Sequence, residues 1–156
     1  MNIKSIFPFL FFLIACSSTS YIRDASDFKE ADKTKPFVYT KIKLEALSNR
    51  YEGYFLRIEN LLQTTIDKDL NKCVLFQMKD PGKLITGRFE MQAGNRMAKP
   101  RSIRRWEFND IKQGFYFLGT LTQDSYGALV FDEGNKDECD AYIKTLNPDF
   151  DPKSAI

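Results

Sequence analysis

The chain has 156 residues, and its 43% hydrophobic and 28% charged residues indicate one globular domain of ordinary size rather than a disordered protein. A net charge of +2 gives no electrostatic support for a dedicated nucleic-acid-binding protein, so no nucleic-acid partner is expected. The sequence has no histidine, which removes the commonest general base, the commonest zinc ligand and the histidine-paired nucleophiles. We therefore expect a protein that is not an enzyme and that uses neither a cofactor nor a metal ion.

The first 20 residues carry the features of an export signal in the usual order. Lys4 provides a positive charge, and residues 6–15 are apolar apart from Pro8. This run has the length of a secretory signal and is about half of the roughly 20 residues that a membrane-spanning helix needs. A polar stretch over residues 17–20 ends the run. Residues 1–15 are therefore predicted to be a signal peptide.

The end of the apolar run, Leu13-Ile14-Ala15-Cys16, resembles the lipobox of bacterial lipoproteins. In that family a lipid is joined to the Cys thiol, the signal is removed before that Cys, and the new amino group is acylated. The resemblance implies that Cys16 is lipidated. It also implies a cell-envelope location, and Ser17 in place of Asp favours the outer membrane, at either its periplasmic face or the cell surface. The alternative is an ordinary secretory signal with an incidental cysteine.

The segment after the signal is rich in Ser, Thr and charged residues. Residues 16–35 are therefore predicted to comprise the lipidated cysteine and a flexible tether, with the option of a short helix over residues 27–32. A flexible linker of about 19 residues reaches roughly 25 Å on average. Pro36 is predicted to mark the start of the folded domain.

Five strands are predicted in the body of the chain. They cover residues 54–63, 73–78, 85–92, 114–122 and 128–132. The clearest pattern is that of residues 85–92, where apolar and polar residues alternate strictly. A short helix or turn over residues 43–51 precedes the strands, residues 93–102 are predicted to be a loop, and residues 123–127 a turn.

A helix is predicted after the last strand. Asn135 is its expected N-cap, and Asp137 and Glu138 favour the first turn because the helix dipole stabilises negative charge there. The spacing i, i+3, i+4 and i+7 gives one apolar face with Cys139, Tyr142, Ile143 and Leu146. Asn147 and Pro148 are expected to end the helix.

The order of these elements resembles the OB-fold domains of exported bacterial proteins. Residues 50–58 resemble their helix, glycine and long first strand, and residues 114–120 with the turn at Gly127 resemble their last hairpin. The resemblance covers about residues 40–133. It implies a mainly β fold, a small five-stranded OB-like β-barrel with flanking short helices, over a domain of residues 36–147 with a tail of residues 148–156. A different small β-barrel or an α+β sandwich is the alternative.

Two cysteines remain when Cys16 carries the lipid, namely Cys73 and Cys139. An even pair in an exported protein suggests a disulfide, which the chain-entropy model credits with about 4 kcal/mol of stabilisation. The alternative is two buried free thiols, because Cys packs well as a small hydrophobic residue.

Charge is distributed unevenly along the chain. Residues 83–105 contain seven basic residues and one acid, whereas the chain from residue 107 onward contains ten acids and four lysines. The residues predicted to bind a partner or ligand are Arg96, Arg101, Arg104, Arg105 and Trp106. Arginine beside an aromatic ring suits a protein partner or an anionic component of the envelope. The alternative is a solvated loop facing the acidic part of the same chain.

These features predict a lipid-anchored lipoprotein of the cell envelope whose folded part is a non-catalytic binding or assembly module. Its expected partners are the membrane, through the lipid anchor, and a protein or an anionic component of the envelope. Two alternatives remain open: an envelope enzyme that uses carboxylates without histidine, and a purely structural surface lipoprotein.

Overall fold

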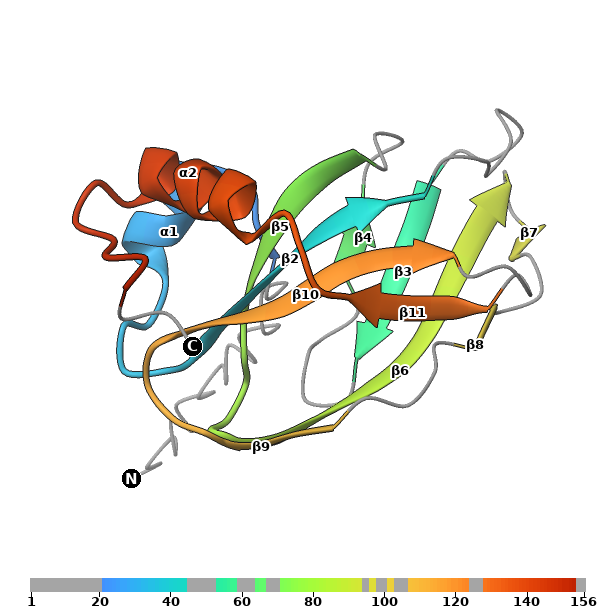
Figure 1. Cartoon of the computed structure of the whole chain (residues 1–156), viewed down its shortest axis with the longest axis horizontal. Helices are drawn as coiled ribbons and strands as arrows, with labels where there is room; N and C mark the ends of the chain where they lie inside the picture. The colour runs from blue at the N-terminus through green and yellow to red at the C-terminus, as the bar shows by residue number, and fades with distance from the viewer. Residues whose placement is uncertain are drawn as a thin grey trace, which may run out of the picture.

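The computed structural model is mainly β, with two short helices (Figure 1). It describes residues 21–44, 53–58, 64–66, 71–93, 96–97, 101–102, 107–123 and 128–153, and side-chain burial over residues 21–44, 71–82, 109–122 and 128–153. Among the described residues, no helix is both long enough and apolar enough to cross a membrane.

Five strands form a mixed sheet in the order β1-β5-β2-β10-β11. Their bounds are β1 Tyr21–Ile22, β2 Phe37–Lys43, β5 Asn71–Gln77, β10 Phe115–Gln123 and β11 Leu129–Asp132. The central strand β2 pairs antiparallel with β5 and parallel with β10. Within the described ranges no pairing closes this sheet, so the mainly β class is confirmed but a closed barrel is not.

A second sheet is built around the long strand β6. Its strands are β3 Gly53–Ile58, β4 Thr64–Ile66, β6 Gly82–Ala93, β7 Arg96–Met97, β8 Arg101–Ser102 and β9 Glu107–Ile111. The chain passes from the first sheet to the second between β2 and β3 and returns between β4 and β5. It crosses again between β5 and β6 and returns between β9 and β10 (Figure 1).

The central strand β2 was not predicted from the sequence. Its first six residues are all buried, because α2 and α1 pack near one face of the first sheet while the other face is also covered. A strand buried on both faces lacks the polar alternation that marks a half-exposed strand. The predicted helix or turn over residues 43–51 is wrong at its start, because Lys43 ends β2; residues 45–51 of it lie outside the described residues.

The other predicted strands agree well with the structure. The alternating residues 85–92 lie within β6, and the predicted second, fourth and fifth strands correspond to β5, β10 and β11. The predicted first strand starts as β3, and residues 59–63 of it lie outside the described residues. The predicted loop over residues 93–102 contains the short strands β7 and β8. The strands β1, β4 and β9 were not predicted.

The helix α1 (Ala25–Glu30) overlaps the optional short helix over residues 27–32, and with β1 it shows that the predicted flexible tether is wrong for residues 21–35. The Asp24 carboxylate caps the helix by accepting the backbone N–H groups of Ser26 and Asp27. Phe28 is buried against Phe37 and Phe115, with ring centroids 5.3 and 6.1 Å apart. Residues 16–20 lie outside the described residues.

The helix α2 (Lys136–Leu146) confirms the predicted C-terminal helix and ends at Asn147 as expected. It lies beside α1 over one face of the first sheet and contacts β2 and β5 (Figure 1). Asn135 does occupy the N-cap position, but its side chain makes no capping hydrogen bond. Its amide instead donates to the Thr120 hydroxyl at 3.1 Å, so this detail of the prediction is corrected.

Candidate functional site

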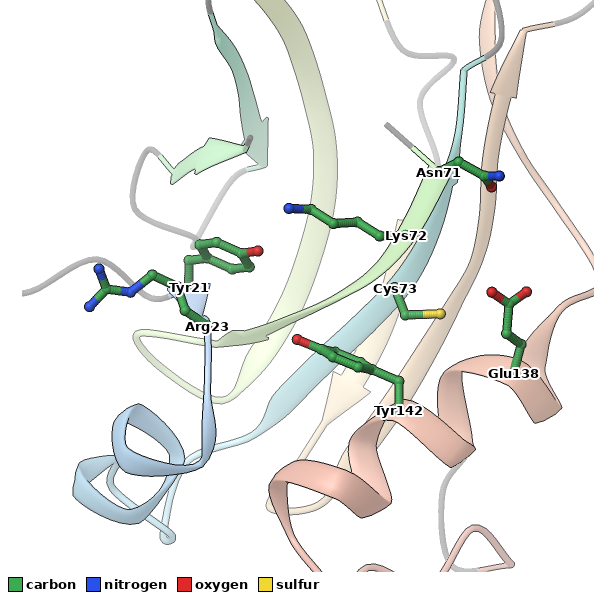
Figure 2. A pocket seen from close by; sticks show the side chains of 7 residues that line it. All are labelled: Tyr21, Arg23, Asn71, Lys72, Cys73, Glu138 and Tyr142. Atoms are coloured by element: carbon green, nitrogen blue, oxygen red, sulfur yellow. The ribbon is translucent and has the colours of Figure 1, made fainter. Parts of the chain in front are cut away.

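The candidate site is a hollow of about 650 Å³ bounded by β1, the start of β5 and α2 (Figure 2). We call it the β1–α2 hollow. The residues that line it are Tyr21, Arg23, Asn71, Lys72, Cys73, Glu138 and Tyr142. Three segments far apart in the sequence therefore supply its walls.

One wall is held in place because three consecutive residues of α2 each bond to the sheet. The pairs are Glu138 with Lys41, Cys139 with Cys73, and Asp140 with Tyr39. They comprise an ion pair, a covalent cross-link and a hydrogen bond within one turn of helix. The position of α2 relative to β2 and β5 is thus fixed by bonds as well as by apolar packing.

Cys73 lines the β1–α2 hollow and is paired with Cys139 of α2. The Cα atoms of Cys73 and Cys139 are 5.3 Å apart, within the usual range for a disulfide, and their sulfur atoms are within bonding distance. Cys139 is completely buried and Cys73 nearly so. The predicted pairing is confirmed in the structure, and the alternative of two separate free thiols does not fit this geometry.

The buried carboxylate of Asp140 is shared by two donors. The Tyr39 hydroxyl donates to Oδ1, and the Lys136 ammonium donates to Oδ2 at 2.8 Å. Burial, reinforced by the hydrogen bond to Asp140, raises the pKa of Tyr39 above its ordinary value, so the phenol keeps its proton. These contacts compensate the desolvated charge and fasten α2 to β2.

The charges around the β1–α2 hollow are arranged in pairs. Glu138 accepts a hydrogen bond from the buried Lys41 ammonium. The Arg23 guanidinium donates to both oxygens of Asp27, through Nε at 2.8 Å and a terminal nitrogen at 3.2 Å. These hydrogen bonds lower the pKa of Asp27. Lys72 also lines the hollow.

Two tyrosines face the same space from opposite walls. Figure 2 shows the hydroxyl groups of Tyr21 and Tyr142 directed toward the region between β1 and α2, and the Lys72 side chain directed toward the Tyr21 side. The Tyr21 ring packs against Phe76 with centroids 5.6 Å apart. Burial raises the pKa of Tyr142, so its hydroxyl stays protonated and able to donate. The hollow therefore combines phenol donors with cations.

The structure leaves the predicted basic segment largely undescribed. Cys16, Arg104, Arg105 and Trp106 lie outside the described residues. The backbone of Arg96 belongs to β7 and that of Arg101 to β8, and both strands pair with β6, opposite Ala93 and Phe89 respectively. The structure thus places these two backbone positions on separate short strands beside β6, and binding by the segment stays a prediction.

The β1–α2 hollow was not predicted from the sequence. Tyr21 and Arg23 were assigned to the tether, and Lys72 lies at the start of a strand with no distinguishing pattern. The available signal was the Tyr21-Ile22 pair, which interrupts an otherwise polar segment, together with the cysteines that join β5 to α2.

Comparisons of the chain with protein-family models, with curated proteins and with solved structures give no match. Within the described ranges, no group of three or more His, Cys, Asp or Glu side chains is arranged to hold a metal ion.

Proposed function

We propose that the protein is a lipoprotein of the cell envelope, anchored through acyl chains on Cys16, whose folded part is a non-catalytic binding or assembly module. The observation that carries this proposal is the buried Cys73–Cys139 pair. Disulfides persist in oxidising compartments, which a protein reaches only by export. The lipobox-like residues ending at Cys16 supply a mechanism for export and attachment together. Ser17 after that cysteine favours the outer membrane.

The short distance between anchor and domain supports a role at the membrane surface. Tyr21, the first residue of β1, follows Cys16 by only five positions. Five extended residues span at most about 18 Å. A domain attached in this way stays next to the bilayer. This position suits contact with other envelope components at the membrane surface better than binding of partners far from the membrane.

The carboxylates of α2 already have partners within the fold, which favours a binding role over a catalytic one. Asp140 is held by Tyr39 and Lys136, and Glu138 is held by Lys41. A carboxylate that acts as a general acid or base needs access to substrate and a pKa near the working pH. Carboxylates that fasten a helix to a sheet have a structural role instead.

Acyl labelling tests the anchor. Bacteria producing the wild-type chain, Cys16→Ser or the neighbouring control Ser17→Ala are grown with a labelled fatty acid, and the protein is recovered from membrane and soluble fractions. We expect label and membrane recovery for the wild type and for Ser17→Ala, and neither for Cys16→Ser. Label that persists in Cys16→Ser, or an unlabelled wild type, contradicts the proposal.

The basic segment is the second proposed contact region. A pull-down of the protein from native envelopes, compared with the Arg101/Arg104/Arg105→Ala variant, measures its contribution. We expect the variant to lose partners, because arginine forms bidentate contacts that alanine cannot replace. Equal recovery of every partner removes the segment from the proposal.

A further inference from the structure

The β1–α2 hollow lies where the folded chain begins. Tyr21 and Arg23 line it, and Tyr21 follows Cys16 by five positions, at most about 18 Å of extended chain. We propose that the hollow binds the phosphate group of anionic phospholipids in the bilayer that holds Cys16. This inference rests on the proposed function, because acylation of Cys16 is what brings the bilayer within reach.

The pairing of β1 holds the hollow at the membrane-proximal end of the domain. Tyr21 and Ile22 pair antiparallel with Phe76 and Leu75 of β5, and Ile22 is buried. The two residues therefore belong to the sheet rather than to a flexible linker. Because the anchored segment ends in the wall of the hollow, the hollow remains close to the headgroups in any orientation of the domain.

The lining has the chemistry of the membrane interface. Arginine and lysine are the residues that proteins use to bind phosphate oxygens, and Arg23 and Lys72 lie on the β1 and β5 sides of the hollow. Tyrosine is enriched at membrane surfaces, because its ring tolerates an apolar environment while its hydroxyl needs a polar one. Tyr21 and Tyr142 are half-buried and direct their hydroxyls into the same space (Figure 2).

The nearby acids are already bound, which favours an anion in the hollow over a cation. Glu138 accepts from Lys41, and Asp27 accepts from Arg23. Asp24 accepts the backbone N–H groups that begin α1. Two of the five N–H donors of the Arg23 guanidinium bond to Asp27. The guanidinium can therefore also donate to a second acceptor, such as a phosphate oxygen.

The test uses the protein as extracted from membranes, in a neutral detergent. It is titrated with dihexanoyl phosphatidylglycerol, dihexanoyl phosphatidylcholine or inorganic phosphate, and binding is followed through the backbone amide resonances. We expect saturable shifts at Tyr21, Lys72 and Tyr142 with phosphatidylglycerol, and no such shifts with phosphatidylcholine. Loss of one basic contact near an anionic surface corresponds to about five-fold weaker binding, which is the change expected for Lys72→Ala.

The control is Lys144→Ala, which removes an exposed lysine of α2 that does not line the hollow and is expected to leave binding unchanged. Lys72→Arg is expected to restore binding. The inference is overturned if Lys72→Ala binds like Lys144→Ala, or if both lipids give the same shifts. It is also overturned if inorganic phosphate binds as tightly as phosphatidylglycerol, because the site then serves a free anion. Acyl labelling fails or succeeds separately from this titration, so the two proposals are distinguished.

Discussion

Removal of the Cys73–Cys139 cross-link is expected to cost the domain a large part of its stability. The two residues are separated by 66 positions, so the cross-link restricts a long segment of the unfolded chain. For a closed loop of that length the chain-entropy model gives about 4 kcal/mol. The Glu138–Lys41 and Asp140–Tyr39 contacts remain when both cysteines become alanine, so α2 should stay docked in the folded state.

Urea unfolding of the wild type and the Cys73→Ala/Cys139→Ala variant measures this difference. A loss of about 4 kcal/mol shifts the midpoint by about 2 M when the slope is about 2 kcal/mol per M. Reduced wild type should unfold like the double variant, and the exposed substitution Ala141→Ser should change nothing. A loss below about 1 kcal/mol, or a wild type insensitive to reductant, refutes the reasoning.

Three further substitutions test individual contacts within the folded domain. Tyr39→Phe removes the hydroxyl that binds Asp140 and is expected to cost about 1–3 kcal/mol in urea unfolding. Because the pKa of Tyr39 is raised in the folded state above its ordinary value of 10.0, the stabilisation is complete below about pH 10 and declines as the pH rises further, a decline that Tyr39→Phe should weaken. Gly119→Ala is expected to cost about 1–3 kcal/mol, because φ is +101° and an added Cβ meets the Asp132 carbonyl oxygen at 2.7 Å; an unchanged melting temperature contradicts this. Phe28→Ala is expected to lower the free energy of unfolding by about 3–5 kcal/mol, measured by thermal or urea unfolding, because Phe28 is buried. If Phe28 belonged to a flexible tether, the substitution would leave the stability unchanged.

Elements with a strong local pattern were predictable from the sequence. The strand β6 shows strict alternation, and α2 presents one apolar face at helical spacing. The pairing of Cys73 with Cys139 followed from the count of cysteines and the inferred export. In each case the information lies within a few neighbouring residues or in a single residue type.

The central strand β2 could not be predicted from the local sequence, because its polar residues form hydrogen bonds with residues far along the chain. The Thr40 hydroxyl donates to the Gly119 carbonyl oxygen, 79 positions away, and Lys41 binds Glu138, 97 positions away. Buried polar groups are tolerated only when such partners exist, and no local pattern reports them. The strand β1 has only two residues, too few to show any period.

The candidate site was hidden for the same reason. Residues 21, 72 and 142 meet only after β1 pairs with β5 and α2 packs on the sheet. The barrel implied by the OB-fold resemblance also depends on long-range pairing. In the described part of the chain, the parallel pairing of β2 with β10 creates a mixed sheet with β11 at its edge rather than a closed ring of strands.

The mass of the N-terminal tryptic peptide tests the central claim most directly. Trypsin cleaves after Arg23, so the mature protein should release residues 16–23 as its first peptide. The account predicts a peptide that begins at Cys16 and carries acyl chains on both its sulfur and its amino group. A first peptide with the mass of unmodified residues, whichever residue it begins with, contradicts the account.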